Sequence, residues 1–303
     1  MDYHIKILGS GSALPTANRN LSAQVLTFRD KNYLIDCGEG TQTQMRKYKI
    51  PFQRIAHIFI SHLHADHFLG LPGLLSSMSL LGRENELHLF GPKGLKEFLD
   101  VSFRISDTYL GFPLHFHETK ADEKRRIYED AHIEVYSFPL FHRIACTGFY
   151  FTEKVKPLKF DKKLLEKYFL SPQQIHEIKN GADFMAPDGR FYPNHEITSL
   201  PPKPKSYAYC CDTAPFADLI SHIKGVDTLF HEATFASNLS NRAAETRHST
   251  AAQAATHAKE AGAKKLILSH FSSRYTQTED LLQEAQSIFA NTYAASDGEQ
   301  YAI

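Results

Sequence analysis

The 303-residue chain has no tryptophan, only four cysteines and no excess of charge of either sign. Its 34 basic residues balance 34 acidic ones, so global charge does not indicate a nucleic-acid partner and any basic surface must be local. The cysteines, Cys37, Cys146, Cys210 and Cys211, have no C-x-x-C spacing and do not resemble a disulfide framework. We therefore expect reduced, buried thiols in a cytoplasmic protein.

Long hydrophobic segments and targeting signals are missing as well. No uninterrupted apolar run approaches the roughly 20 residues that span a bilayer. The N-terminal segment MDYHIKILGSGSALP lacks the charged-then-apolar layout of a signal peptide. We expect no membrane partner. With 42% hydrophobic residues the chain is long enough to bury a core, and its length permits one large domain or two small ones.

Short apolar runs alternate with helical patterns along most of the chain, and many runs end abruptly in polar or glycine-containing loops. This alternation predicts an α/β fold in which helices cover sheets. The predicted strands are 4–8, 33–35, 55–60, 133–140, 207–209, 228–230 and 266–268. The predicted helices are 69–81, 92–103, 214–223, 250–261 and 278–289.

Residues 152–204 differ from the rest, because the short apolar runs that predict strands become rare and lysines accumulate. Short helices are predicted at 164–168 and 171–180, the second because Ser171 can cap it and Pro172 fits its first turn. We interpret this region as an inserted, flexible arm. The alternative is a solvent-exposed insertion that binds no partner. Its first five lysines, the arm lysines, are Lys154, Lys156, Lys159, Lys162 and Lys163.

The segment SHLHADH, directly after the predicted strand 55–60, carries the strongest chemical signal. It places three imidazoles and one carboxylate within six residues: His62, His64, Asp66 and His67. Imidazole and carboxylate together suit zinc or another first-row divalent ion. Four ligands exceed what one tetrahedral site takes from a single loop, so we expect two adjacent ions. A surface histidine cluster is the less favoured alternative.

Three more candidate ligands follow other predicted strands: His142, Asp212 and His270. Each alone would more often be structural. Together with the loop they supply seven nitrogen and oxygen ligands, enough for two ions if Asp212 bridges them. We therefore expect two Zn²⁺ per subunit, with Mn²⁺ or another divalent ion as the alternative.

The H-x-H-x-D-H loop, with the three later ligands, resembles the metallo-β-lactamase superfamily of hydrolases. The resemblance implies a four-layer αβ/βα sandwich, with 1–303 as a single domain and 152–204 as its inserted arm. It also implies that Asp36, in LIDCGEG, supports the site from behind the ligands. The ligand sets it implies are His62, His64 and His142 for one zinc, Asp66, His67 and His270 for the second, and Asp212 as the bridge.

Three further segments resemble the ribonuclease Z family of tRNA 3′-processing endonucleases. HEAT at 231–234 follows a strand, HST at 248–250 opens a helix, and PTANRN at 15–20 resembles P-x-K-x-R-N with Ala17 in place of lysine. The resemblance implies a homodimer that cleaves precursor tRNA just after the discriminator nucleotide, leaving a 3′-hydroxyl on the tRNA and a 5′-phosphate on the trailer. It implies that Asp66 accepts a proton and that His248 either protonates the leaving oxygen or stabilises the pentavalent phosphorane, while Glu232 fixes the tautomer of His248. RNA contacts are assigned to Arg19, Asn20 and the arm lysines.

Two other functions remain open from the residues. A hydrolase of a small phosphodiester, ester or lactone would use the same metals. A catalytically inactive RNA-binding module would keep the fold, but such copies normally lose ligands, and all seven candidates are present together with His248. GSGSALP does not match a nucleotide-binding loop, and we expect a tight turn that brings backbone close to the metal pocket.

Overall fold

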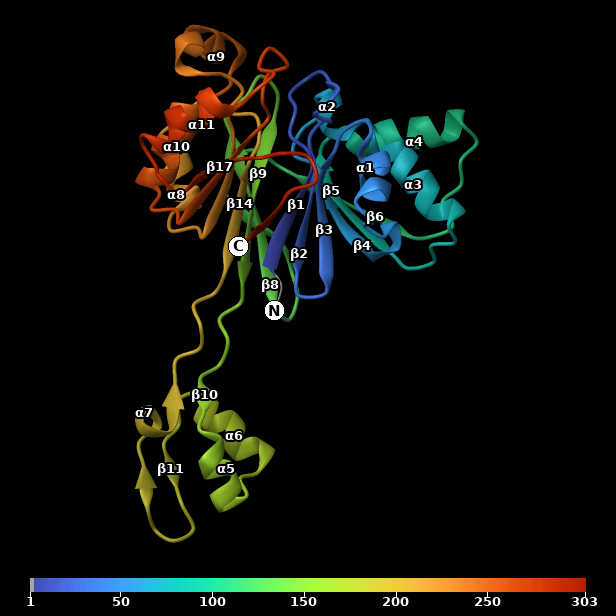
Figure 1. Ribbon diagram of the computed structural model, residues 1–303. Helices are drawn as coiled ribbons and strands as arrows, with labels where there is room; N and C mark the ends of the chain where they lie inside the picture. The colour runs from blue at the N-terminus through green and yellow to red at the C-terminus, as the bar shows by residue number, and fades with distance from the viewer. Residues whose placement is uncertain (1–2) are drawn as a thin grey trace. The chain divides into compact units, whose positions relative to one another are not determined.

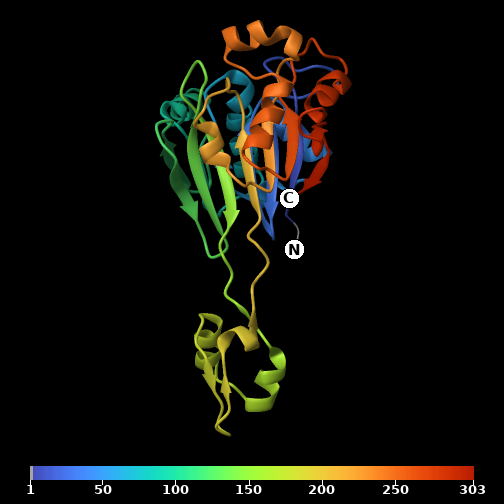
Figure 2. The same ribbon diagram turned by 90° about the vertical axis from the view of Figure 1, so that its left-hand side faces the viewer.

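The computed structural model describes residues 3–303, and two seven-stranded sheets dominate it (Figure 1). The first sheet has the order β18-β1-β2-β3-β4-β5-β6 and the second β17-β16-β15-β14-β9-β8-β7. Helices α1, α3 and α4 pack on the first sheet, and α8, α10 and α11 cover the second, as the orange and red ribbons of Figure 2 show. The layers run helix, sheet, sheet, helix, which confirms the predicted αβ/βα sandwich.

The first sheet joins an antiparallel part to a parallel part. β18, β1, β2 and β3 pair antiparallel, whereas β3, β4, β5 and β6 are parallel. Its strands are β1 (Tyr3–Gly9), β2 (Ala23–Phe28), β3 (Lys31–Cys37), β4 (Ile55–Phe59), β5 (Leu87–Pro92), β6 (Leu114–Thr119) and β18 (Gln300–Ala302). The helices between them are α1 (Thr41–Lys47), η1 (Phe52–Arg54), α2 (Ala65–Phe68), α3 (Leu71–Leu80) and α4 (Leu95–Ile105).

In the second sheet, β14 to β17 are parallel neighbours, so their carboxyl ends meet at one edge. Its strands are β7 (Arg125–Glu129), β8 (Ile133–Leu140), β9 (Cys146–Glu153), β14 (Ser206–Cys210), β15 (Thr228–Glu232), β16 (Lys265–Ser269) and β17 (Thr292–Ala294). The associated helices are α8 (Leu219–Ile223), η2 (Ser237–Leu239), α9 (Ser240–Thr246), α10 (Ala251–Glu260) and α11 (Glu279–Gln286).

Aromatic side chains fill the space between the two sheets. Phe59 on β4 lies 5.4 Å from the ring of Phe149 and 5.3 Å from that of Phe151, both on β9. Tyr33 on β3 makes an edge contact with Phe151 at 6.0 Å. All four side chains are buried, so this packing holds the two sheets face to face and brings the strand ends of both to one edge.

Most predicted elements are confirmed to within a few residues, and β8 coincides with the predicted strand 133–140. The helix predicted at 214–223 is wrong in its first half, because the amide of Ala214 bonds to Phe141 O beyond β8 and the helix begins only at Leu219. The helix predicted from residue 92 begins at Leu95, because Pro92 still belongs to β5. All four cysteines are free and buried, as expected.

The chain divides into two compact units, and the second comprises 130–134 and 152–205. It has a small core of its own, with Ile178, Phe184 and Ile197 buried in it. Its elements are β10 (Lys159–Phe160), α5 (Lys162–Tyr168), α6 (Pro172–Lys179), β11 (Phe184–Met185), β12 (Phe191–Tyr192), α7 (Asn194–Ile197) and β13 (Thr198–Ser199).

Helix α6 confirms the predicted helix 171–180 and its start. The Ser171 hydroxyl accepts from the Gln174 amide at 3.2 Å, and the Gln174 side chain accepts from the Ser171 amide at 2.9 Å. These reciprocal bonds form a capping box, with Pro172 in the first turn. Among residues 3–303, none of the helices combines the length and apolar composition needed to cross a bilayer.

Candidate metal centre and acid–base pair

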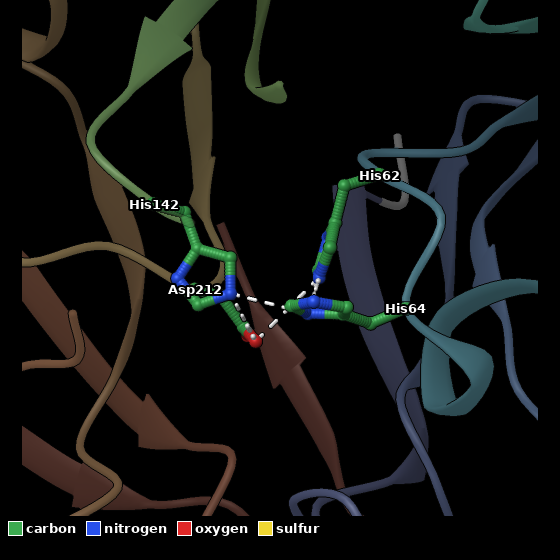
Figure 3. A group of neighbouring side chains, drawn as sticks. All are labelled: His62, His64, His142 and Asp212. Atoms are coloured by element: carbon green, nitrogen blue, oxygen red, sulfur yellow. Dashed lines mark hydrogen bonds and ion pairs between the residues drawn. The ribbon is translucent and has the colours of Figure 1, made fainter. Parts of the chain in front are cut away.

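The seven predicted ligands meet where strands of both sheets end. His62 follows β4, His142 follows β8, Asp212 follows β14 and His270 follows β16 directly. Figure 3 shows His62, His64, His142 and Asp212 turned toward one another from three separate segments of the chain. The sandwich packing therefore gathers side chains that lie more than 200 residues apart in sequence.

Four side chains form the first group. His64 Nδ1 lies 3.1 Å from His62 Nε2 and 3.2 Å from His142 Nε2. Asp212 Oδ2 lies 3.6 Å from Nε2 of both His62 and His142. Three imidazole nitrogens and one carboxylate oxygen thus surround a common point.

The second group uses the other oxygen of the same carboxylate. Asp212 Oδ1 lies 3.4 Å from His67 Nε2 and 3.1 Å from His270 Nε2. Asp66 Oδ2 lies 3.5 Å from His67 Nε2 and 3.4 Å from His270 Nε2. Asp212 therefore presents one oxygen to each group, which is the arrangement that a bridging ligand requires.

Asp36 supports this edge from behind, at a positive φ of 54°. Its Oδ2 lies 2.7 Å from His67 Nδ1 and accepts from the hydroxyls of Ser61 and Tyr209 at 2.8 and 2.6 Å. Its Oδ1 accepts from the Ser61 amide at 2.7 Å. A carboxylate that accepts from Nδ1 leaves the Nε2 lone pair of His67 facing the centre.

Other ligands are oriented by backbone and hydroxyl groups. His142 Nδ1 donates to Arg247 O at 2.9 Å, and His270 Nδ1 lies 2.9 Å from Thr234 Oγ1. The amide of Ala13 donates to Asp66 Oδ2 at 2.8 Å. The expectation that the GSGSALP turn approaches the metal pocket is thereby confirmed. Ala13 and Arg247 were missed as contributors, because a backbone donor or acceptor leaves no mark in sequence, and Thr234, which acts through its hydroxyl, was missed as well.

The residues present fit a pair of divalent ions. Among residues 3–303, His67 Nε2 and Asp212 Oδ1 are buried without a hydrogen-bond partner, and both point into the second group. Two ligand atoms each ~2.0–2.2 Å from one tetrahedral ion are about 3.3–3.6 Å apart, close to the spacings in both groups. Burial alone would raise the pKa of Asp212, but His270 and His67 outweigh it and hold that pKa well below its ordinary range. The carboxylate is therefore ionised and suited to bind cations.

His248 and Glu232 form an acid–base pair beside this centre. His248 Nδ1 lies 2.8 Å from Glu232 Oε1, and the ring centroid of His248 lies 5.1 Å from that of His142. Glu232 also accepts from the Thr213 amide at 2.8 Å, which fixes the carboxylate. Burial lowers the pKa of His248, but the charge and hydrogen bond of Glu232 outweigh it and raise that pKa to about 9. The imidazole is thus held protonated at neutral pH.

The predicted RNA-contact residues are spread over both compact units. Arg19 donates to Tyr275 O at 2.5 Å, and the Asn20 side chain donates to Asp297 at 3.0 Å. Of the arm lysines, Lys156 bonds to Glu153 at 2.8 Å, Lys159 and Lys163 are exposed, Lys154 is half-buried, and the side chain of Lys162 lies outside the described part. None of these contacts tests RNA binding, which stays a prediction.

Comparison with known proteins finds one family model over part of the chain and relatives over nearly all of it. Residues 3–156 match the family model described as Anti-Pycsar protein Apyc1. Ribonuclease Z of Bacteroides fragilis is 44% identical over 295 residues, which cover 97% of each chain. Ribonuclease Z of Cytophaga hutchinsonii is 46% identical over 304 residues, covering 100% of this chain and 97% of that relative.

Solved structures show the same architecture. The crystal structure of human tRNase Z, short form, aligns with a TM-score of 0.74 at 30% identity and covers 99% of both chains. The metallo-β-lactamase fold protein YhfI from Bacillus subtilis aligns with a TM-score of 0.71 over 100% of both chains, and at 17% identity it shows the fold alone. The predicted metallo-β-lactamase fold is confirmed.

Replacing Asp212 tests whether one carboxylate serves two ions. We expect elemental analysis to find two divalent ions per wild-type chain and fewer than one in Asp212→Ala, because both carboxylate oxygens are lost. His142→Ala should lose mainly one ion, and the exposed His132→Ala serves as the control. Retention of both ions by Asp212→Ala would contradict the shared-ligand arrangement.

Proposed function

This chain belongs to the ribonuclease Z family, and its residues 3–156 also match the family of Anti-Pycsar protein Apyc1; on this basis we propose how its site works. The chain is a metal-dependent tRNA 3′-processing endoribonuclease. We propose two Zn²⁺ per subunit and a single cut just after the discriminator nucleotide of precursor tRNA. The tRNA keeps a 3′-hydroxyl and the trailer a 5′-phosphate. The carboxylate of Asp212, shared between two ligand groups beside the His248–Glu232 pair, is the observation that carries the proposal.

The ions would be held by the two groups described above. His62, His64 and His142 would bind the first, Asp66, His67 and His270 the second, and Asp212 would bind both. Bound divalent ions lower the pKa of water and neutralise phosphate charge, which makes hydrolysis of a phosphodiester feasible near neutral pH. Contacts with Asp36, Thr234 and Arg247 O would keep three of these imidazoles in the tautomer that such binding needs, namely those of His67, His270 and His142.

Asp66 is the proposed proton acceptor for the attacking water. The Ala13 amide bonds to Asp66 Oδ2 at 2.8 Å, and the same oxygen faces His67 and His270. Because Oδ2 is occupied by these partners, we assign the proton transfer to Oδ1. The oxygen of the water forms the new bond to phosphorus, and this phosphorus stays on the trailer as its 5′-phosphate.

His248 is the proposed acid for the leaving group. Its Nδ1 is held by Glu232, so Nε2 is the nitrogen that would deliver a proton to the 3′-oxygen of the tRNA as the P–O bond breaks. Burial would raise the pKa of Glu232, but His248 lowers it. The carboxylate therefore stays ionised, and it keeps the imidazole charged and correctly turned.

The arm lysines are the proposed tRNA contacts, because phosphate recognition needs only local positive charge. Lys159 and Lys163 are exposed in the second unit, and Arg19 and Asn20 lie on the loop that carries Ala13. We also propose a cytoplasmic location, because all four cysteines are free thiols.

A homodimer is the proposed assembly. Four large apolar side chains near the ends of α3 and α4 are exposed by half or more: Leu80, Leu81, Ile105 and Tyr109. The Ser79 hydroxyl donates to Tyr109 O at 3.3 Å, so the loop after α4 lies against the end of α3. An apolar surface of this kind is a candidate for burial against a second copy.

Mapping the cut tests the reaction and its catalytic pair. A 3′-labelled precursor tRNA should be cut once by the wild type, directly after the discriminator. Asp66→Ala should lose activity, because a ligand and the proton acceptor are removed together. His248→Ala should lower kcat by about 10²- to 10⁴-fold, because leaving-group protonation is lost.

The control for that assay is His257→Ala, which removes a buried imidazole of the same unit that lies against His231 and not in the centre. It should keep the cut and its position. A zinc-replete wild type that leaves the precursor intact but hydrolyses a small phosphodiester, ester or lactone would favour the alternative hydrolase and overturn the assignment.

The pH dependence tests the role of Glu232. Because the pKa of His248 is raised to about 9, the acid form is present below that pH and is lost as pH rises through it. Removing the charge with Glu232→Gln lowers this pKa, so the alkaline decline of kcat should move to lower pH. Glu245→Gln, on the exposed side of α9, is the control. An alkaline decline that does not move would refute the pairing.

Mixing two defective variants tests the arm and the dimer together. Lys159→Ala/Lys163→Ala should lower kcat/KM and reduce the slope of log kcat/KM against log salt by about 1 per lysine. A mixture of this double variant with Asp66→Ala should be much more active than the sum of the two variants assayed separately. In a mixed dimer, the intact arm of the Asp66→Ala subunit can present tRNA to the intact centre of the other subunit. Strict additivity would count against trans action by the arm.

A further inference from the structure

Four histidines lie next to one another on the first sheet, away from the metal centre. The parallel register pairs His57 on β4 with His88 on β5, and His88 with His115 on β6. His117 lies two residues beyond His115, so it projects from the same face. The register of three strands therefore places four imidazoles on one face toward the β6 edge.

These rings stack across the strands. The His88 ring lies 5.3 Å from that of His57, 5.1 Å from His115 and 5.2 Å from His117, each in a stacked orientation. At the inner end of the row, His57 is buried, and the centroid of its ring lies 4.3 Å from that of Tyr128. The outer end is open, because the side chain of His88 is 27% exposed and that of His115 is 47% exposed.

The carboxylate of Glu86, just before β5, faces two of these imidazoles. Its Oε1 lies 3.5 Å from His88 Nε2, and its Oε2 lies 3.2 Å from His115 Nε2. On the other side of the same ring, His88 Nδ1 lies 2.9 Å from His117 Nε2, within hydrogen-bond distance. If His88 donates through Nδ1, its Nε2 carries a lone pair directed at a carboxylate oxygen, and a cation between the two removes that repulsion.

We propose that Glu86, His88 and His115 form a third divalent-metal site, with His117 holding the ring of His88 in the ligating tautomer. Imidazole and carboxylate ligands suit Zn²⁺ and its first-row neighbours. A ligating histidine commonly donates its other ring N–H to a nearby acceptor, which is the part that His117 Nε2 plays here.

The two distances from Glu86 to the imidazoles are similar to the nitrogen–oxygen distances of the metal centre in the same molecule. There the nitrogen–oxygen distances between candidate ligands run from 3.1 Å for His270 and Asp212 to 3.6 Å for His142 and Asp212. The two distances at Glu86, 3.5 and 3.2 Å, fall within this range. Glu86 faces the two imidazoles with different oxygens, so the stacked rings of His88 and His115 must tilt toward each other to share an ion.

The exposure of the site predicts its behaviour. The side chain of Glu86 is 63% exposed, so water completes the coordination and the ion exchanges with solvent. Such a site binds more weakly than the buried centre, whose ligands have exposures of 10% or less in the pairs with Asp212 and Asp66. It therefore fills only after the catalytic ions are in place.

Calorimetric titration of zinc-loaded protein with Zn²⁺ tests this proposal. Metal analysis first establishes two ions per chain, and the wild type should then bind one further equivalent. Glu86→Gln and His115→Gln should each weaken that binding at least tenfold. Both side chains are exposed, so the variants should keep the wild-type thermal unfolding temperature and precursor-tRNA cleavage, which separates this test from the proposed function.

The matched control is His195→Gln, which removes an exposed imidazole that lies 4.0 Å from a carboxylate, that of Glu196, in the second unit. It should bind the further equivalent as the wild type does. The proposal is overturned if the zinc-loaded wild type takes up no third ion. It is equally overturned if Glu86→Gln and His115→Gln bind that ion as tightly as His195→Gln.

Discussion

Asp212 presents one buried carboxylate oxygen to His62 and His142 and the other to His67 and His270. An ionised carboxylate is costly to bury unless charges of opposite sign surround it. Both ligand groups and the packing that brings β8, β14 and β16 to one edge therefore depend on a cation pair, or on protonated imidazoles in its absence.

The positions that support the centre store backbone strain. Ala13, Asp36, Arg247 and His270 all have φ between 54° and 59°, a region that non-glycine residues seldom adopt. Each supplies a ligand or a group that orients one: an amide to Asp66, a carboxylate to His67, a carbonyl to His142 and an imidazole to Asp212. Strain of this kind persists only where surrounding structure over-determines it, as it does at functional sites.

The candidate metal centre and the proposed site at Glu86 differ in how the sheets position their side chains. At the candidate metal centre, loops after strands of both sheets converge, and most of the candidate ligands are buried. At Glu86, His88 and His115, neighbouring strands of one sheet place the side chains by register alone, and solvent reaches them. The first arrangement suits permanent ions that take part in chemistry, and the second suits an ion that comes and goes with its concentration.

The sequence by itself determined the α/β alternation, the start of α6 at Ser171 and the seven candidate ligands, because periodicity, caps and metal-ligand spacing are local signals. Only the tertiary structure decided that Asp212 faces both groups, that Ala13 and Arg247 orient ligands through their backbones, and that the helix at 214–223 starts late. It also decided the row of His57, His88 and His115, whose members are about 30 residues apart in sequence. Strand register and sheet packing set these contacts between distant segments, and no local pattern encodes them.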